Sequence, residues 1–251
     1  MEKKEKKTHK GVILKNEKVA NELFLIEFEA HDVEQVLAGQ FVSILCGNLT
    51  LRRPFSVANF DASKKIISVY FKRKGDGTDY LSHLNKGDEI DFIGAMGNTF
   101  SITDKKSLII GAGVGFAPVF YLAKSLKKAT TVGAFTTRED IPSNLYADYF
   151  VTNDGSRGLS GSILEHLDEL IEKEKPEIIY SCGPLVVLKA ISQKGVEKNI
   201  ETQIALEKIM ACSIGVCRGC VIKVRDENGE IVNKAVCKDG PVFSGKDIVW
   251  D

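Results

Sequence analysis

The sequence predicts a multidomain β plus α/β protein, with a β-barrel in residues 1–102, a parallel α/β sheet in 103–205 and a small C-terminal domain in 206–251. Three observations support this division. Short apolar segments separated by glycines fill the first part and are typical of a small barrel. Apolar strands alternate with helical spacing in the second part, which indicates a parallel sheet. Four cysteines crowd the third part.

The barrel part consists of short segments with strand alternation. Residues 11–30 divide into two strands, and the charged pair Glu17 and Lys18 predicts the turn between them. Three further strands are expected within residues 39–47, 64–74 and 86–100. The exception is GTDYLSHL, which predicts a short helix after Gly77.

The α/β part begins at residues 106–126, where an apolar strand, a glycine turn and helical spacing follow one another. Further strands are expected within residues 130–137, 148–154 and 176–183, and helices within 161–174 and 184–195. Strands that alternate with helices in this way pair in parallel.

Net charge and the character of the N-terminal segment exclude several classes of protein. The 34 basic and 34 acidic residues give a net charge of zero, which argues against a general nucleic-acid binder. The start, MEKKEKKTHK, has no apolar segment behind it, so we expect a solvated tail and neither a signal peptide nor a membrane span. A cytoplasmic protein follows, in which thiols stay reduced.

The C-terminal cysteines have a recognisable spacing. Cys212, Cys217 and Cys220 follow C-x4-C-x2-C, and Cys237 stands further along the chain. This is the plant-type [2Fe–2S] spacing, in which a loop brings three thiolates together. A structural zinc site is the alternative, but such sites usually present two C-x2-C pairs and only one occurs here.

Two glycine-rich segments are candidate phosphate sites. Gly111 and Gly113 stand between a strand and a helix, although Phe116 occupies the third position of a strict G-x-G-x-x-G. In the barrel part, Gly75, Gly77 and Thr78 precede the expected short helix and could hold an anionic group. A simple tight turn and a capped hairpin are the alternatives.

A third candidate is LRRPFSVANF. Arg53 could neutralise a phosphate, Phe55 offers a flat face and Ser56 offers a hydroxyl, while Pro54 stiffens the backbone between them. The alternative is an edge strand with a surface arginine.

Together these pieces resemble the ferredoxin–NADP reductase superfamily, in the same order along the chain. Arg53-Pro54-Phe55-Ser56 matches its flavin motif, the glycine turn of residues 111–118 matches its nicotinamide domain, and Cys182-Gly183-Pro184 matches its late C-G-P. Within that superfamily, LEKIMACSIGVCRGCVIKV and VCKDGPVF look like the electron-transfer subunit of the two-subunit, NAD-linked dihydroorotate dehydrogenase.

The resemblance implies FAD in the barrel, NAD in the α/β domain and a [2Fe–2S] cluster in the C-terminal domain. It implies that the chain relays electrons between NAD and an FMN-containing catalytic subunit in pyrimidine biosynthesis, in a heterotetramer with two copies of each chain. The implied cofactor residues are Arg53, Pro54, Phe55, Ser56, Gly75, Gly77, Thr78, Gly111, Gly113 and Cys182, and the implied metal ligands are Cys212, Cys217, Cys220 and Cys237.

The sequence departs from this family at two positions. Ser213 and Ala95 stand where relatives often have glycine and proline, and we expect Ser213 to fit if its φ stays negative. The adjacent Arg138 and Glu139 leave the choice between NADP and NAD open locally, and the resemblance favours NAD.

Other functions remain open. A related reductase could serve ferredoxin, polysulfide or an electron-bifurcating partner. A zinc-binding interaction module is the alternative from another class. We assign no acid–base catalytic residue, because hydride and electron transfer are performed by the cofactors.

Overall fold

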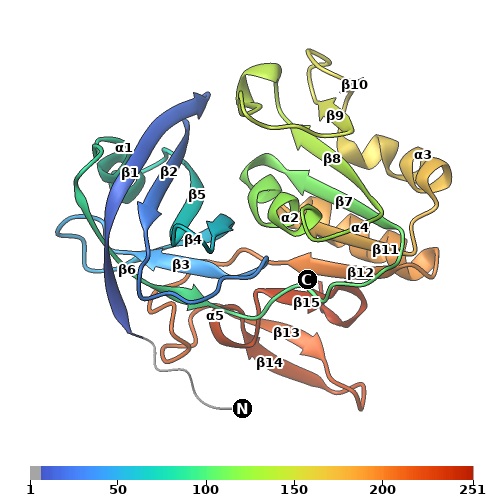
Figure 1. The fold of residues 1–251 in the computed structure, drawn as a ribbon. Coiled ribbons are helices and arrows are strands. Elements are labelled where there is room, and N and C mark those ends of the chain that lie inside the picture. The colour runs from blue at the N-terminus through green and yellow to red at the C-terminus, as the bar shows by residue number, and fades with distance from the viewer. Residues whose placement is uncertain (1–6, 251) are drawn as a thin grey trace.

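The computed structural model describes residues 7–250 and confirms the predicted fold class. Figure 1 shows a β-barrel on one side, an α/β sheet on the other, and a C-terminal segment below both. Most of the charged start of the chain lies outside the described residues. Within residues 7–250, no helix combines the length and apolar character needed to cross a membrane.

The barrel is closed by six strands in the order β1-β2-β5-β4-β3-β6. Its elements are β1 (Thr8–Ala20), β2 (Leu23–Glu29), β3 (Phe41–Ile44), β4 (Arg53–Asp61), β5 (Ile66–Lys72), α1 (Asp76–Ser82) and β6 (Glu89–Met96). Alternate residues of the strands, such as Val42 and Ile44 in β3, fill its interior.

One detail of the predicted barrel is wrong. The first turn lies at Asn21 and Glu22, since β1 continues through Glu17 and Lys18 in register with β2. The charged pair resembles a turn because the outer face of this strand is polar. The alternative interpretation of LRRPFSVANF as an edge strand is excluded, because β4 pairs with both β3 and β5.

The sheet of the α/β domain has the order β10-β9-β8-β7-β11-β12-β15. Its strands are β7 (Ser107–Ala112), β8 (Ala129–Phe135), β9 (Tyr149–Thr152), β10 (Leu159–Ser160), β11 (Ile178–Cys182), β12 (Glu201–Ala205) and β15 (Val242–Ser244). The strand order reverses between β7 and β11, so their carboxyl ends form the topological switch point where open α/β sheets bind ligands.

Helices cover both faces of this sheet. They are α2 (Phe116–Ala123), α3 (Ile163–Glu174) and α4 (Leu185–Glu197), with short 3-10 turns η1 (Gly113–Gly115) and η2 (Arg138–Asp140). Ser162 and Glu165 form a capping box that fixes the start of α3. The buried residues of α3 and α4 share one core, whereas Val119 and Leu122 of α2 belong to another on the opposite face.

The C-terminal segment connects the two larger parts. It contains β13 (Val221–Arg225), β14 (Ile231–Ala235), α5 (Val236–Asp239) and η3 (Gly245–Asp247). β15 pairs antiparallel with β12, which adds an edge strand that the sequence did not predict. Phe41 and Met96 of the barrel, Ile204 of the sheet and Val236 of this segment belong to one hydrophobic core, which joins the three parts.

Candidate functional site

A cavity of about 240 Å³ opens where the three parts meet. Its walls come from β4 and β5 of the barrel, from the start of α2, and from the segment that follows β12. The lining residues are Phe41, Pro54, Phe55, Ser56, Tyr70, Phe71, Lys72, Lys74, Val114, Ala117, Leu206, Glu207, Lys208, Met210 and Pro241.

Three residues of the predicted flavin motif line this cavity. Pro54, Phe55 and Ser56 lie side by side on β4, and Phe55 packs beside Phe71 of β5 with ring centroids 5.9 Å apart. Aromatic faces and a hydroxyl at the wall of an apolar cavity suit a flat heteroaromatic ring.

Arg53 lies at the other end of the motif, against the loop before α1. A Cβ built on Gly77 would approach the Arg53 side chain to 3.1 Å, so the absence of a side chain allows the loop and the arginine to meet. The first N–H groups of a helix have no intrahelical partner. Arg53 therefore brings positive charge beside this loop, where it could hold a phosphate group.

Thr78 differs from its predicted place. The helix α1 starts at Asp76, so Gly77 and Thr78 both lie within its first turn and do not precede it. Its Oγ accepts N–H bonds from Lys74 (2.9 Å) and Gly75 (3.2 Å). The hydroxyl thus shapes the loop by holding two of its backbone N–H groups.

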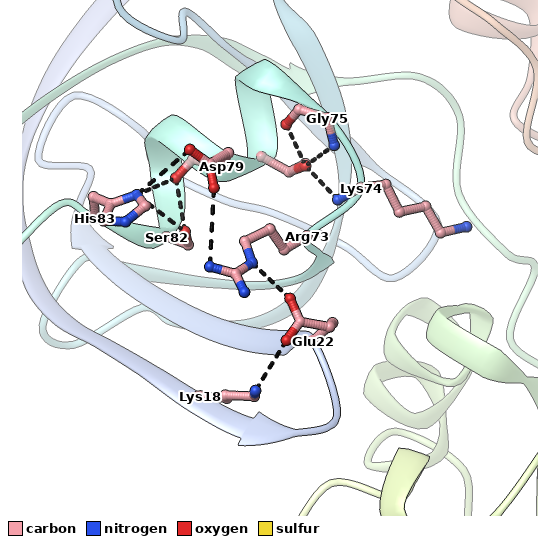
Figure 2. A network of polar contacts seen from close by, with 9 residues as sticks. Lys18, Glu22, Arg73, Lys74, Gly75, Asp79, Ser82 and His83 are labelled. Carbon is pink, nitrogen blue, oxygen red and sulfur yellow. Dashed lines mark hydrogen bonds and ion pairs between the residues drawn. The ribbon is translucent and has the colours of Figure 1, made fainter.

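A polar network supports the same loop from outside (Figure 2). Arg73 Nε donates to Glu22 Oε2 at 2.6 Å, and Lys18 Nζ donates to Glu22 Oε1 at 3.0 Å. The hydrogen bond from Arg73 is the main reason why the pKa of Glu22 is lowered. Lys74 points away from this network and lines the cavity.

Charges at the cavity wall are mostly positive. Lys72, Lys74 and Lys208 line it, with Glu207 as the acidic residue among them. The Glu207 side chain is exposed to the open cavity, yet the surrounding protein desolvates its carboxyl and raises its pKa, while Lys74 acts in the opposite direction. A ligand with negative charge is favoured by this wall.

The glycine turn lies at the switch point of the sheet. A Cβ on Gly111 would overlap Phe116, and one on Gly115 would overlap the Cys182 carbonyl, so both glycines are needed for close packing. Gly113 is different, because its φ is +54° and a built Cβ meets no atom within 4 Å. Open space beside a left-handed glycine suits the approach of a ligand to the backbone.

Cys182 ends β11 at the same switch point. Its thiol is buried, and desolvation, followed by the negative charge of Glu207, raises its pKa well above the ordinary value. A reactive thiol needs a lowered pKa, so Cys182 acts here as a packing residue whose backbone borders the site.

The predicted NAD-selecting residues follow β8. Arg138 and Glu139 are both exposed, and the Arg138 N–H donates to Ser156 Oγ at 2.8 Å. A hydrogen bond with the Thr137 side chain is the main cause of the lowered pKa of Glu139, so its carboxylate is charged at neutral pH. Both residues are available to a ribose at the carboxyl edge of the sheet.

The four predicted metal ligands form two pairs. The Cys217 N–H donates to Cys212 Sγ, and the Cys237 N–H donates to Cys220 Sγ, each at 3.4 Å. Cys220 and Cys237 are buried, whereas Cys217 is exposed. Among residues 7–250, no three His, Cys, Asp or Glu side chains are close enough to hold one metal ion.

The thiols differ in acidity. Burial opposes ionisation of Cys212, but backbone N–H groups, first that of Cys217, lower its pKa to about 6. Burial, together with the neighbouring Cys220, raises the pKa of Cys237 to about 12. Thiolates repel each other, so a bound cation is needed to hold all four in the ionised form.

The donor set fits a [2Fe–2S] cluster. In such a cluster four thiolates share two irons, and two thiol pairs match this arrangement better than a single tetrahedral ion does. Backbone N–H groups already point at sulfur, including that of Gly219 at 3.4 Å from Cys217 Sγ. Hydrogen bonds to the ligand sulfurs tune such clusters.

The condition stated for Ser213, a negative φ, is not met. Its φ is +59°, in the left-handed region that glycine adopts more easily. The side chain is buried, and its hydroxyl accepts a hydrogen bond from Ser43 Oγ at 3.0 Å. The serine is therefore accommodated by the tertiary contact that it makes.

Several lining residues were not found from the sequence, namely Tyr70, Lys72, Lys74, Glu207 and Met210. The first three precede the loop at Gly75, and the pairing of β5 with β4 could have indicated that they face the flavin motif. Glu207 and Met210 stand in the segment LEKIMAC that carries the family resemblance, but their place at the cavity depends on how the three parts of the chain pack together.

Comparison with known proteins agrees with this site. Residues 207–249 match the model of the iron–sulfur cluster binding domain of dihydroorotate dehydrogenase B. The chain is 36% identical to the electron transfer subunit of dihydroorotate dehydrogenase B (NAD(+)) from Caldanaerobacter subterraneus subsp. tengcongensis, over 96% of this chain and 98% of that protein. The protein of the same name from a Geobacillus species is 33% identical, over 97% and 99% of the two chains.

Solved structures give the same fold. A chain of the NADH-dependent reduced ferredoxin–NADP oxidoreductase, studied for flavin-based electron bifurcation, is similar with a TM-score of 0.84 and 28% identity, over 96% of this chain and 90% of that one. The ferredoxin reductase of carbazole 1,9a-dioxygenase is similar in fold, with a TM-score of 0.69 and 21% identity, over 77% and 66% of the two chains.

We predict that Cys217→Ala removes iron from the protein but leaves most of the FAD. The reason is that Cys217 belongs to one thiol pair, while the flavin-motif residues lie on β4 of the barrel. Iron analysis and flavin absorbance after anaerobic purification provide the measurement. Cys46→Ala, which removes a buried barrel thiol outside the cluster segment, is the matched control for iron and should keep it; its flavin content is not compared, because Cys46 lies beside Gly77. Stoichiometric zinc without iron in the unmodified protein would contradict the assignment.

Proposed function

Because this chain belongs to the electron transfer subunits of dihydroorotate dehydrogenase B, we propose that it relays electrons between a catalytic dihydroorotate dehydrogenase subunit and NAD. The 36% identity to a curated member over 96% of the chain carries the family assignment. The cofactors are FAD, a [2Fe–2S] cluster and NAD. When bound, FAD exchanges two electrons with the nicotinamide as a hydride, and the cluster carries electrons one at a time.

The observation that carries the proposal is the meeting of three sites at one junction. The cavity has Ser56 on its barrel wall, Val114 on its α/β wall and Met210 on the wall that leads to Cys212. Each wall comes from the domain to which the corresponding cofactor is assigned. A relay needs this adjacency, because electrons and hydrides pass only between groups held close together.

The chain's own residues would position the cofactors and close the barrel against the α/β domain. Phe55 and Ser56 would hold the flavin ring, and Arg53 with the loop of Gly75, Gly77 and Thr78 would hold its pyrophosphate. Tyr70 packs edge-on against Phe116 at 4.8 Å, which seals the barrel against the α/β domain. Gly111 and Gly113 would admit the nicotinamide, with the backbone of Cys182 on the opposite side of the switch point.

The four cysteines Cys212, Cys217, Cys220 and Cys237 are the proposed cluster ligands. Their loop offers a contact surface, in which Ile209 is 91% exposed and Val216 is 76% exposed. Large apolar side chains at this exposure are typical of an interface core. The catalytic subunit would dock here, with the cluster at the point of electron transfer.

The finer points of the assembly are also part of the proposal. They are an FMN in the catalytic subunit and a heterotetramer with two copies of each chain. We further propose that residues 1–102, 103–205 and 206–251 are the FAD, NAD and cluster domains, with β15 shared between the last two. A cytoplasmic location agrees with ligand thiols that must remain reduced.

A related bifurcating reductase is the second candidate. The similarity to the NADH-dependent reduced ferredoxin–NADP oxidoreductase, at a TM-score of 0.84, favours it. The two functions differ in the protein that exchanges electrons with the cluster, so the identity of the flavoprotein that purifies with this chain distinguishes them.

We predict a preference for NADH over NADPH. The Glu139 carboxylate at the end of β8 repels a 2′-phosphate, and Glu139→Gln should raise the relative kcat/KM for NADPH about fivefold, as expected from removing roughly 1 kcal/mol of repulsion in water. Dye reduction with each nucleotide measures this ratio. Glu172→Gln, at an exposed position on α3, is the control. A higher kcat/KM for NADPH in the unmodified chain would contradict the assignment and point to Arg138.

We predict that the purified chain reduces dyes with NADH but forms no orotate from dihydroorotate. Oxidation of dihydroorotate needs a general base beside a second flavin, and we assign neither to this chain. When the catalytic subunit is added, NAD-linked orotate formation should appear. The absorbance of orotate provides the measurement. Orotate production by the single chain with NAD would refute the subunit assignment.

The docking surface can be tested within the same assay. Arg218 is exposed next to Cys217, and Arg218→Glu should weaken assembly about tenfold while dye reduction changes little. Arg225→Glu is the matched control, because Arg225 pairs with Ile231 at the far end of the β13–β14 hairpin. Equal loss of assembly in both variants would contradict docking at the cluster loop.

A further inference from the structure

A buried pair of hydroxyls joins the barrel to the cluster loop. Ser43 Oγ donates to Ser213 Oγ at 3.0 Å, across 170 positions of sequence. The two residues are 0% and 1% exposed, respectively. A hydroxyl buried without a partner is destabilising, so each serine depends on the other.

The location of Ser43 follows from strand alternation. Val42 and Ile44 point into the barrel core, whereas Phe41 belongs to the core shared with the cluster domain. Ser43 shares the outer face of β3 with Phe41. This face is covered by the C-terminal segment, and the orange stretch between β12 and β13 runs beneath the barrel in Figure 1.

The backbone conformation of Ser213 is unfavourable, and its hydrogen bond to Ser43 offsets this cost. Its φ of +59° disfavours a side chain, since Cβ then crowds the carbonyl oxygen. Glycine would adopt this conformation freely but could not bond to Ser43. The serine therefore gives the loop an anchor at the residue that directly follows Cys212.

The same contact reaches both cofactor sites. Ser43 pairs with Pro54, whose neighbours Phe55 and Ser56 line the cavity. Ser213 directly follows Cys212, one of the four proposed cluster ligands. One side-chain hydrogen bond thus connects β3, the strand that pairs with the flavin-motif strand β4, to the residue next to a proposed cluster ligand.

We propose that Ser43 and Ser213 are positioning residues, whose hydrogen bond fixes Cys212 and the cluster it would ligate at a set place behind the flavin cavity. The inference rests on the proposed function, because it assumes the cluster. Sites that transfer electrons need ligands held by a second set of contacts, and these contacts also set how firmly the metal is bound.

The test uses the full chain loaded with FAD and iron. Ser43→Ala and Ser213→Gly should each release iron to a chelator about tenfold faster than the unmodified protein, as is typical when a contact behind a metal ligand is lost. Each should also change the EPR spectrum of the reduced cluster. Ser43→Thr retains the hydroxyl and should restore both properties.

Two further variants separate positioning from general stability. Ser68→Ala removes another buried hydroxyl of the barrel, which bonds to Glu27 at 2.9 Å, and should leave iron release and EPR unchanged. The double variant Ser43→Ala with Ser213→Gly should be no worse than either single one, because both remove the same bond.

Additive effects in the double variant would overturn the proposal. So would unchanged iron release and EPR in Ser43→Ala, or an equal change in Ser68→Ala. A chain that carries FAD but no iron at all would overturn the proposed function, and this inference with it, whereas normal iron content with no response to Ser43 contradicts only the positioning role.

Discussion

One continuous hydrophobic core determines how this molecule is built. Phe41 and Met96 from the barrel, Ile204 from the sheet, and Val236 with Cys237 from the C-terminal segment are buried in the same cluster. Burial of apolar surface is the main force that holds domains together. The three domains therefore cannot separate without exposing this core, and the cavity at their junction keeps a defined shape.

Directional contacts around this core fix how the parts are oriented. Asn98, just past the last barrel strand, donates to the Val242 carbonyl at 2.8 Å and accepts the Val242 N–H at 2.9 Å. β15 then adds to the edge of the sheet beside β12. Two hydrogen bonds to one residue resist rotation as well as separation, so β15 is held against both the barrel and the sheet.

The sequence predicted what local patterns can encode. Glycine spacing located the turn at Gly113, and cysteine spacing located the thiols, because both depend on a few neighbouring residues. It could not predict that β15 joins the sheet, that Glu207 lines the cavity or that Ser43 contacts Ser213, because these depend on packing between distant segments. The misplaced turn at Glu17 has the same origin, since pairing with β2 decides it and charge does not.

The central claim is that one chain holds an electron path from nicotinamide through flavin to an iron–sulfur cluster. Anaerobic titration of the purified single chain with NADH, followed by visible absorbance and EPR, tests it most directly. We expect flavin bleaching and the cluster EPR signal in the same chain, with uptake of about three electrons, two by the flavin and one by the cluster. Flavin reduction with an iron-containing cluster that stays oxidised and silent in EPR, even with excess NADH, would contradict the account.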